Sequence, residues 1–331
     1  MRKFLFRILF DIIVSLLKFI RMEQKGNPAM IIKMFTVLFS VLILAACNFD
    51  RHSASAASSP DSGYFNVVSV PDPALDEVSG IAASRKSVDI FWVHNDSGDK
   101  ARIFAIDAQG QTIGQVLLAG VKAIDWEDIA TGPGPIADSN YIYIGDIGDN
   151  RARRDFKVIY RIIEPNAQTL RKEKTIRLTD FTTIRFRLPD GARDSEALMC
   201  DPLTKDLYVV SKRENRVHLY RLSFPQDTSR ILTAEFLREL PLTQITAGDI
   251  APSGRHIILK NYLQIFYFPR KAGQTVSEAL DHFPSFLPYK EEPQGEAVCF
   301  AQDESGYYTI SEAPDHRPTK LYFYPYKFTA P

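Results

Sequence analysis

The sequence repeats a short unit in which an acidic residue precedes small and apolar residues. The first unit reads Glu-Val-Ser-Gly-Ile and the third reads Glu-Ala-Leu-Met. The acidic positions are spaced 47 to 69 residues apart, at Glu77, Glu127, Glu196, Asp249 and Glu296. A repeat of this length is typical of folds in which each unit buries its faces only against neighbouring units.

Each acidic unit is followed by two short runs rich in β-branched and aromatic residues, with turn residues between them. The first set of runs is Ile90–Val93, Tyr141–Ile144, Leu207–Val210, Ile257–Leu259 and Tyr307–Ile310. The second set is Arg102–Ile106, Lys157–Ile163, Arg216–Leu222, Gln264–Phe268 and Lys320–Tyr326. Runs of this size bounded by Gly, Pro, Asp and Ser indicate strands. We therefore predict an all-β chain that forms a single β-propeller of five blades.

Several segments bear on the number and closure of the blades. A sixth blade fits if Gln274–Lys290 or the long interval after Glu127 hides a degenerate unit. Within that interval, Thr175–Leu178 and Thr183–Leu188 fit an outer strand of the second blade. Tyr64–Val70 is expected to close the ring as a strand of the last blade, because closure removes exposed sheet edges. A β-sandwich with a second domain is the structural alternative.

The N-terminal part contains a secretory signal. Lys33 precedes the apolar run Met34–Leu44, which ends in Leu-Ala-Ala before Cys47. This ending resembles the lipobox of bacterial lipoproteins, which implies cleavage before Cys47, lipid on its sulfur, and a membrane tether. The alternative is a transmembrane anchor, but the run is shorter than the roughly 20 apolar residues that a span needs.

The resulting organisation is a signal at 30–46, a lipidated cysteine with a Ser/Ala-rich flexible tether at 47–63, and a propeller domain at 64–331. Residues 1–29 are interpreted as a mis-assigned start, with translation beginning at Met30. The run Phe4–Ile20 is apolar, but it carries Arg7, Asp11 and Lys18. These charged residues argue against a membrane span there.

We predict a bacterial envelope protein that faces the periplasm and contacts the membrane through Cys47. Asn48 after the cysteine, rather than Asp, favours the outer membrane. The formal net charge of +0 gives no reason to expect nucleic acid as a partner. Cys200 and Cys299 lie in apolar runs and are expected to be buried thiols rather than a disulfide or zinc ligands.

In a propeller, the first strand of each blade lines the central channel. The five repeated acidic residues are therefore expected to form a ring near one mouth of that channel. Carboxylates this close together repel and need a counter-charge. Ca²⁺ is the natural partner, because it accepts six to eight oxygen ligands in loose geometry. The alternative is a structural role, in which each carboxylate caps backbone N–H groups at a blade start.

The ends of the second strands are expected to form another, chemically mixed ring. Its members in this alignment are Asn95, Asp146, Lys212, Lys260 and Glu312. Two acidic loops, 94–99 and 145–150, follow the first two of these strands and contain Asp96, Asp99, Asp146 and Asp149. Their oxygens suit a hard cation, although such loops are also good turns. The two lysines and Arg213 suit an anionic substrate or are exposed turn residues.

Two further residues have both a functional and a structural interpretation. Trp126 lies between Asp125 and Glu127 and fits a core position between blades better than a stacking surface in the channel. His94 adjoins the first acidic loop and is a weak candidate for a general base or ligand. The sequence contains no Gly-x-Ser-x-Gly elbow, Walker loop or HExxH motif, so those hydrolase and nucleotide-binding classes have no support.

The first unit continues into Phe-Trp-Val-His-Asn-Asp-Ser-Gly-Asp, and the third contains Asp-Ser-Glu-Ala-Leu with Leu-Tyr-Val-Val-Ser-Lys-Arg. These motifs resemble the phytase-like (esterase-like) and SdiA-regulated group of bacterial secreted propellers, at the level of motif spacing over most of Asp76–Tyr326. The resemblance implies a propeller fold, a non-cytoplasmic site and Ca²⁺-assisted phosphoester hydrolysis.

Two functional predictions follow, from different classes. In the first, the chain is a tethered envelope lipoprotein that binds a small molecule, glycan or envelope protein at the channel mouth. In the second, it is a Ca²⁺-dependent hydrolase of phosphate or carboxylate esters, with sugar or lactone chemistry also open. Its catalytic candidates are Glu127, Asp146, Lys212 and Lys260. The metal-ligand candidates are Glu77, Asp96, Asp99, Glu127, Asp146 and Asp149.

Overall fold

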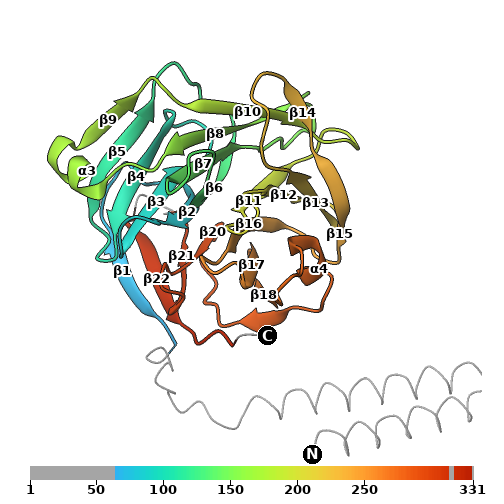
Figure 1. Ribbon diagram of the computed structural model, residues 1–331. Coiled ribbons are helices and arrows are strands. Elements are labelled where there is room, and N and C mark those ends of the chain that lie inside the picture. Colours follow the sequence, from blue (N-terminus) through green and yellow to red (C-terminus); the bar gives the residue numbers. More distant parts are fainter. Residues whose placement is uncertain (1–63, 313–316, 330–331) are drawn as a thin grey trace, which may run out of the picture. The chain divides into compact units, whose positions relative to one another are not determined.

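The computed structural model describes residues 64–312 and 317–329, which form a ring of five β-sheets around a central channel (Figure 1). Each sheet is one blade, so the predicted all-β, five-bladed propeller is confirmed. The described residues contain neither a sixth blade nor a sandwich. The predicted start at Met30, the signal and the lipid-bearing Cys47 lie outside the described residues.

The first two blades each contain five strands. Blade 1 consists of β2 (Val78–Ala83), β3 (Ile90–Asn95), β4 (Arg102–Asp107), β5 (Thr112–Leu118) and β9 (Thr175–Leu178). Blade 2 consists of β6 (Trp126–Pro133), β7 (Asn140–Asp146), β8 (Lys157–Ile163), β10 (Thr182–Arg187) and β14 (Ile231–Thr233).

The other three blades each contain four strands. Blade 3 consists of β11 (Ser195–Cys200), β12 (Leu207–Ser211), β13 (Val217–Leu222) and β15 (Glu235–Leu240). Blade 4 consists of β16 (Ile245–Ile250), β17 (His256–Asn261), β18 (Ile265–Pro269) and β19 (Ser285–Leu287). Blade 5 consists of β20 (Ala297–Phe300), β21 (Gly306–Ile310), β22 (Thr319–Pro325) and β1 (Asn66–Val70).

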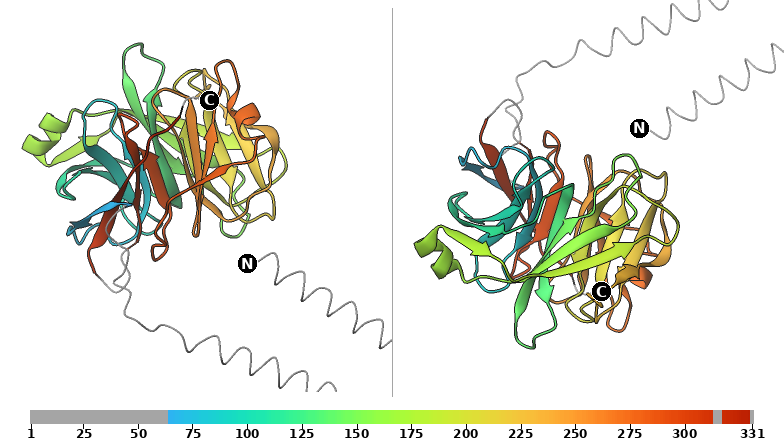
Figure 2. Two further views of the ribbon diagram at one scale, coloured as in Figure 1. Left: turned by 90° about the horizontal axis from the view of Figure 1, so that it is seen from below. Right: turned by 90° about the horizontal axis from the view of Figure 1, so that it is seen from above.

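The ring is closed by the N-terminal strand, as predicted. β1 pairs antiparallel with β22, with Asn66 opposite Phe323 and Val70 opposite Thr319. Inside the ring, the innermost strands β2, β6, β11, β16 and β20 lie next to one another in a closed circle. Figure 2 shows the same sheets from two opposite sides.

One strand assignment differs from the prediction. Thr175–Leu178, expected in blade 2, is β9, and it pairs parallel with β5 in blade 1. The cause is helix α3 (Ala167–Glu173), which packs on β5 and returns the chain to the outer edge of blade 1 (Figure 1). The helix protrudes from the ring in both views of Figure 2. β9 therefore covers an edge that blade 1 would otherwise expose, whereas β10 is the outer strand of blade 2 as predicted.

The segment Gln274–Lys290, where a sixth blade was considered, instead holds α4 (Val276–Ala279) and the short β19. No helix within the described residues is long and apolar enough to cross a membrane.

The core consists of five seams, one between each pair of neighbouring blades. Successive side chains of a strand point to opposite faces of the sheet. Each strand therefore contributes apolar side chains to the seams on both sides of its blade. On β7, Ile142 packs toward blade 1 and Tyr143 packs toward blade 3. Trp126 is 1% exposed in the seam between blades 1 and 2, as the core interpretation expected. Cys200 and Cys299 are buried free thiols.

Candidate metal centre at the channel mouth

β-bulges shape the end of the channel where the inner strands begin, which we call the mouth. In β2, β6, β11 and β16 the pairing register shifts by one residue near the start of the strand. A bulged residue leaves the ladder, and its side chain is re-aimed. The bulged residues are Ser79, Glu127, Glu196 and Thr246.

The bulges correct the predicted ring of five acidic residues. Glu127 and Glu196 occupy equivalent positions, but the equivalent residue in blade 4 is Thr246. Asp249 lies three residues farther down the channel, where its carboxylate accepts the N–H groups of Ile250 at 2.8 Å and Phe300 at 2.9 Å. Glu77 lies two residues before its bulge and is exposed. Residue similarity therefore placed two acidic residues at the wrong level.

The second predicted ring is also out of register. In blades 1 and 2, Asn95 and Asp146 pair with the residues just before the bulges, Val78 and Trp126. In blade 3 the residue just before the bulge is Ser195, and its partner is Ser211. Lys212 therefore lies one position beyond this ring. Its equivalents, counted from the same bulges, are Asp96, Tyr262 and Glu312. Lys260 lies one position before the ring, opposite Ala247.

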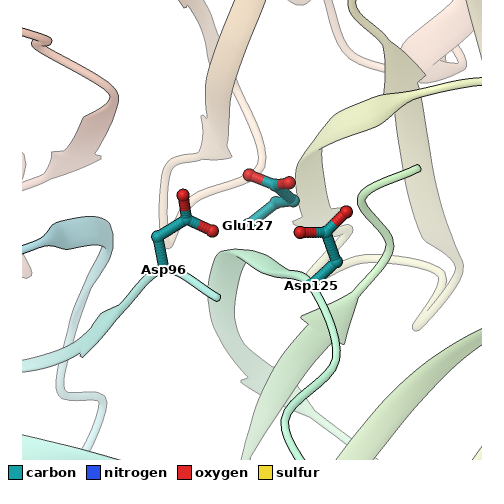
Figure 3. Close-up of side chains that lie close together, drawn as sticks. All are labelled: Asp96, Asp125 and Glu127. Atoms are coloured by element: carbon teal, nitrogen blue, oxygen red, sulfur yellow. The ribbon is translucent and has the colours of Figure 1, made fainter. Parts of the chain in front are cut away.

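Three carboxylates from blades 1 and 2 converge at the mouth. Asp96, Asp125 and Glu127 place carboxylate oxygens within 4.8 Å of one another, and their side chains point toward a common centre (Figure 3). Ca²⁺–oxygen distances are about 2.3–2.6 Å, so oxygens at this separation fit one ion. Asp96 and Glu127 were predicted from the sequence, whereas Asp125 was not.

Glu127 is the most enclosed of the three carboxylates. The residue is 4% exposed, and its carboxylate oxygens, which have no donor among the described residues, still reach the water of the mouth. Burial and the nearby Glu196, Asp96 and Asp125 raise its pKa well above the ordinary value. Carboxylates this close together repel one another, and a divalent ion offsets that repulsion. The donor set therefore fits Ca²⁺.

A second acidic group shares Glu127 but has protein cations of its own. Glu127, Asp194 and Glu196 also bring their oxygens within 4.8 Å. Lys212 Nζ lies 2.5 Å from Glu196 Oε2, and Arg213 Nε lies 2.6 Å from Asp194 Oδ2. Because these two residues are already neutralised, the ion belongs with the first group.

Lys212 also links Glu196 to the fifth blade. Its Nζ lies 3.6 Å from Glu296 Oε1, which accepts the Tyr262 hydroxyl at 2.7 Å. Burial raises the pKa of Glu196 to about 8, against the opposing charge of Lys212. The pKa of Lys212 is raised, because the attraction of Glu196 outweighs its burial. Glu196 and Lys212 therefore stay hydrogen-bonded to each other near neutral pH.

Two of the predicted metal ligands, Asp146 and Asp149, bind loop residues instead. Asp146 accepts the N–H groups of Ile124 and Asp125 at 3.2 Å and lies 2.7 Å from Arg154. Asp149 accepts the N–H groups of Arg153 and Arg154. The structure therefore does not bring Asp146 and Asp149 to the acidic group. They cap turns, as Asp side chains do after strands, and Asp146 positions Asp125.

Three other predicted site residues also lie away from the acidic group. Asp99 lies 2.8 Å from Arg102 Nε and accepts the Asn95 side-chain amide at 3.2 Å. His94 is fully buried beside Trp126, and burial lowers its pKa to about 4. Lys260 is buried, and its Nζ donates to the carbonyls of Gly295 and Asn261.

The channel below the mouth is crossed by polar side chains. Asp128, fully buried, accepts N–H groups from Ile129, Leu198 and Gly248 on blades 2, 3 and 4. Farther down, Arg85 of blade 1 donates to Thr131 Oγ1 on blade 2 and to the Ile250 carbonyl on blade 4. These bonds link different blades below the mouth.

Gly148 provides a direct prediction about the site. A Cβ at this position would lie less than 3.0 Å from Glu127 Oε1 and Asp125 Oδ2. We expect Gly148→Ala to displace both carboxylates and to weaken Ca²⁺ binding about 10-fold or more, an effect of the size seen for displaced ligands. Isothermal titration measures it, with Arg151→Ala in the same loop as the control. Equal affinity in the two variants would contradict the assigned ligands.

The raised carboxylate pKa values predict an unusual pH dependence. Burial raises the pKa of Asp125 to about 6, that of Glu312 to about 7 and that of Glu196 to about 8. Groups with raised values favour the folded state when protonated, so their contribution is present at pH 4 and is lost as pH rises through 6–8. In EDTA, the melting temperature should fall between pH 5 and pH 8.5, and Ca²⁺ should reduce the fall. A flat or rising profile in EDTA would contradict this.

We found no family model that matches the sequence and no matching curated protein. Among solved structures, a gluconolactonase from Xanthomonas campestris is 13% identical, with a TM-score of 0.41 over 79% of this chain and 90% of that one. The Dos1 propeller is 12% identical, with a TM-score of 0.35 over 76% and 69%. Both likenesses concern the fold and not the activity. Membership of the phytase-like or SdiA-regulated group stays a prediction.

Proposed function

We propose that this chain is an envelope lipoprotein whose propeller binds Ca²⁺ at the channel mouth and hydrolyses esters there. The observation that carries the proposal is the convergence of Asp96, Asp125 and Glu127, whose carboxylate oxygens lie within 4.8 Å of one another with no protein cation among the described residues paired to Glu127. Those three residues would hold the ion. When bound, it lowers the pKa of a water molecule and polarises an ester oxygen.

The neighbouring residues supply a proton acceptor. Glu196 presents one oxygen to Lys212 Nζ, so its other oxygen, Oε1, is available to take a proton from the attacking water. Burial raises the pKa of Glu196, so its ionised form, paired with Lys212, is a stronger base than an ordinary carboxylate. Lys212 and Tyr262 keep Glu196 and Glu296 in place. The crossed channel below the mouth limits access by bulk water.

The experiment uses the full chain with Cys47→Ser, which removes the predicted lipid. Release of 4-nitrophenol from aryl esters is measured in CaCl₂ and in EDTA, beside Ca²⁺ titration. We expect turnover that requires Ca²⁺. At saturating Ca²⁺, Glu196→Gln should lower kcat about 100-fold, within the usual contribution of a general base. Ca²⁺ binding without turnover would instead support the non-catalytic ligand-binding function, and absence of both would overturn the proposal.

The tether has its own test. Cys47→Ser should move the protein from the membrane fraction to the soluble periplasm and abolish labelling by radioactive palmitate, because a lipid chain provides the anchor. Asn48→Ala serves as the control and should keep the label. Membrane association that survives Cys47→Ser would contradict the lipoprotein assignment.

A further inference from the structure

The basic residues at the mouth bear on what substrate it accepts. Lys212, predicted to stabilise negative charge on a substrate, is held between two carboxylates, 2.5 Å from Glu196 and 3.6 Å from Glu296. Its Nζ also lies 5.2 Å from the centroid of the Tyr262 ring. An ammonium group offers three donors, and these neighbours surround it. Lys212 is therefore a partner of Glu196 rather than a free anion-binding group.

Two buried lysines point to backbone carbonyls instead of the mouth. Lys260, also predicted to stabilise substrate charge, donates to Gly295 and Asn261 and lies 4.5 Å from the centroid of the Tyr289 ring. Lys157 is 2% exposed and donates to the carbonyl of Ile147. Both ammonium groups are therefore held by backbone carbonyls of the protein.

The two arginines nearest the carboxylates are likewise paired. Arg154 Nη1 lies 2.7 Å from Asp146 and donates to the Gly148 carbonyl at 2.8 Å. Arg213 Nε lies 2.6 Å from Asp194, and its Nη2 donates to the Asn150 side chain. Phosphate sites use arginine forks that are open to the ligand. Here part of each guanidinium group already binds residues of the protein, although the Arg213 side chain stays half exposed.

The charge of the site stays negative after an ion is added. Asp96, Asp125 and Glu127 carry three negative charges when ionised, one more than Ca²⁺ neutralises. Glu312 remains beside them, and the charges of Glu296, Asp96 and Glu77 act on it. A phosphate ester brings one or two further negative charges into this field, whereas a carboxylic ester brings none.

We propose that the mouth accepts esters without negative charge, namely carboxylic esters or lactones, and rejects phosphate esters. The inference rests on the proposed hydrolase function and names its substrate class. Arg151 and Arg153 are exposed in the adjoining loop, and the backbone N–H of Arg153 binds Asp149. Within the described residues they are exposed basic side chains of the 145–150 loop region that are available to hold a phosphate ester if the inference is wrong.

The test compares three substrates with the same leaving group on the Cys47→Ser chain in CaCl₂. They are 4-nitrophenyl acetate, the 4-nitrophenyl monoester of succinate, which carries a carboxylate, and 4-nitrophenyl phosphate. The rate that remains in Glu127→Gln is subtracted for each substrate. After this subtraction, kcat/KM should be highest for 4-nitrophenyl acetate. The succinate ester should be about 10-fold poorer, and the phosphate should show no turnover. Added salt should reduce the difference in kcat/KM between the acetate and the succinate ester. Salt screens the repulsion between the substrate carboxylate and the carboxylates of the mouth.

Glu312→Gln is the matched variant. Removing one negative charge should raise the kcat/KM of the succinate ester relative to that of the acetate by about 3-fold or more, as expected for one nearby charge at partial exposure. A ratio that stays constant would show that the charge of the mouth does not select substrates, and it would overturn the inference.

The remaining outcomes separate the two proposals. Ca²⁺-dependent hydrolysis of the phosphate in preference to the acetate, lost in an Arg151→Ser/Arg153→Ser double variant, would overturn the charge inference and keep the hydrolase function. If no ester is turned over, the hydrolase function fails. Phenylphosphonate is then added to the chain loaded with Mn²⁺, a divalent substitute for Ca²⁺ that keeps the charge of the site and whose bound water is followed by proton relaxation. Displacement of ion-bound water by phenylphosphonate would overturn the exclusion of phosphoryl ligands, and no displacement would uphold it.

Discussion

Glu127→Gln should lower Ca²⁺ affinity about 100-fold or more and remove the thermal stabilisation that Ca²⁺ gives the wild type. Changing outer-sphere partners of a metal typically costs 10–100-fold in affinity, and a ligand itself costs at least as much. An ion at 100 times its Kd stabilises a protein by about 2.7 kcal/mol. For a chain of this size that corresponds to a shift of roughly 5–10 °C.

The variant should remain folded without metal, and in EDTA it should melt above the wild type. Glutamine has nearly the volume of glutamate, and the repulsion of Glu127 by Glu196, Asp96 and Asp125 disappears. Asp99→Asn is the matched control, because Asp99 has its own partner, Arg102, at 2.8 Å. This control should keep the Ca²⁺ shift.

Terbium gives a second measurement of the same site. Trp126 lies between Asp125 and Glu127 in the chain, so it should transfer excitation energy to a Tb³⁺ ion bound there. Sensitised emission should be present in the wild type, absent in Glu127→Gln and strongly reduced in Trp126→Phe. Emission that survives Glu127→Gln would place the ion elsewhere and contradict the assigned ligands.

Asp128→Ala should be the most destabilising single substitution within the channel. The carboxylate is fully buried and joins three blades through the N–H groups of Ile129 at 2.8 Å, Leu198 at 2.9 Å and Gly248 at 3.4 Å. Alanine leaves these donors buried without an acceptor, at about 1–3 kcal/mol each. We expect the free energy of unfolding in urea to fall by about 3–6 kcal/mol.

Asp303→Ala is the control for this variant. The Asp303 carboxylate accepts hydrogen bonds from Ser305 within its own exposed turn, so the loss should stay below about 1 kcal/mol. If Asp128→Ala lowers the free energy of unfolding as little as Asp303→Ala does, water replaces the carboxylate in the channel. In that case the three blades would not depend on this residue.

The sequence determined the blade plan of this protein because its signals are local. Strand runs such as Tyr141–Ile144 alternate with a period of two, and this period supplies both seams of a blade. The spacing of the repeat predicted five blades, and the unpaired run before the first unit predicted closure by β1. A pattern that repeats in the chain needs no tertiary information to be recognised.

The members of the site were decided by tertiary structure. Asp125 and Asp194 precede Glu127 and Glu196 by two residues, and this repeated Asp-x-Glu pattern was the available signal that the acidic alignment passed over. The same alignment included Asp249, which lies farther down the channel.

The physical reason is the β-bulge. One extra residue in an inner strand shifts every later residue of that strand against its neighbour, and similarity between repeats does not reveal it. The partners of each carboxylate were equally hidden from the sequence. Asp146 binds backbone N–H groups and an arginine, whereas Glu127 binds none of these. Which acidic residue is left without a partner depends on contacts between segments distant in the chain, and the fold alone creates those contacts.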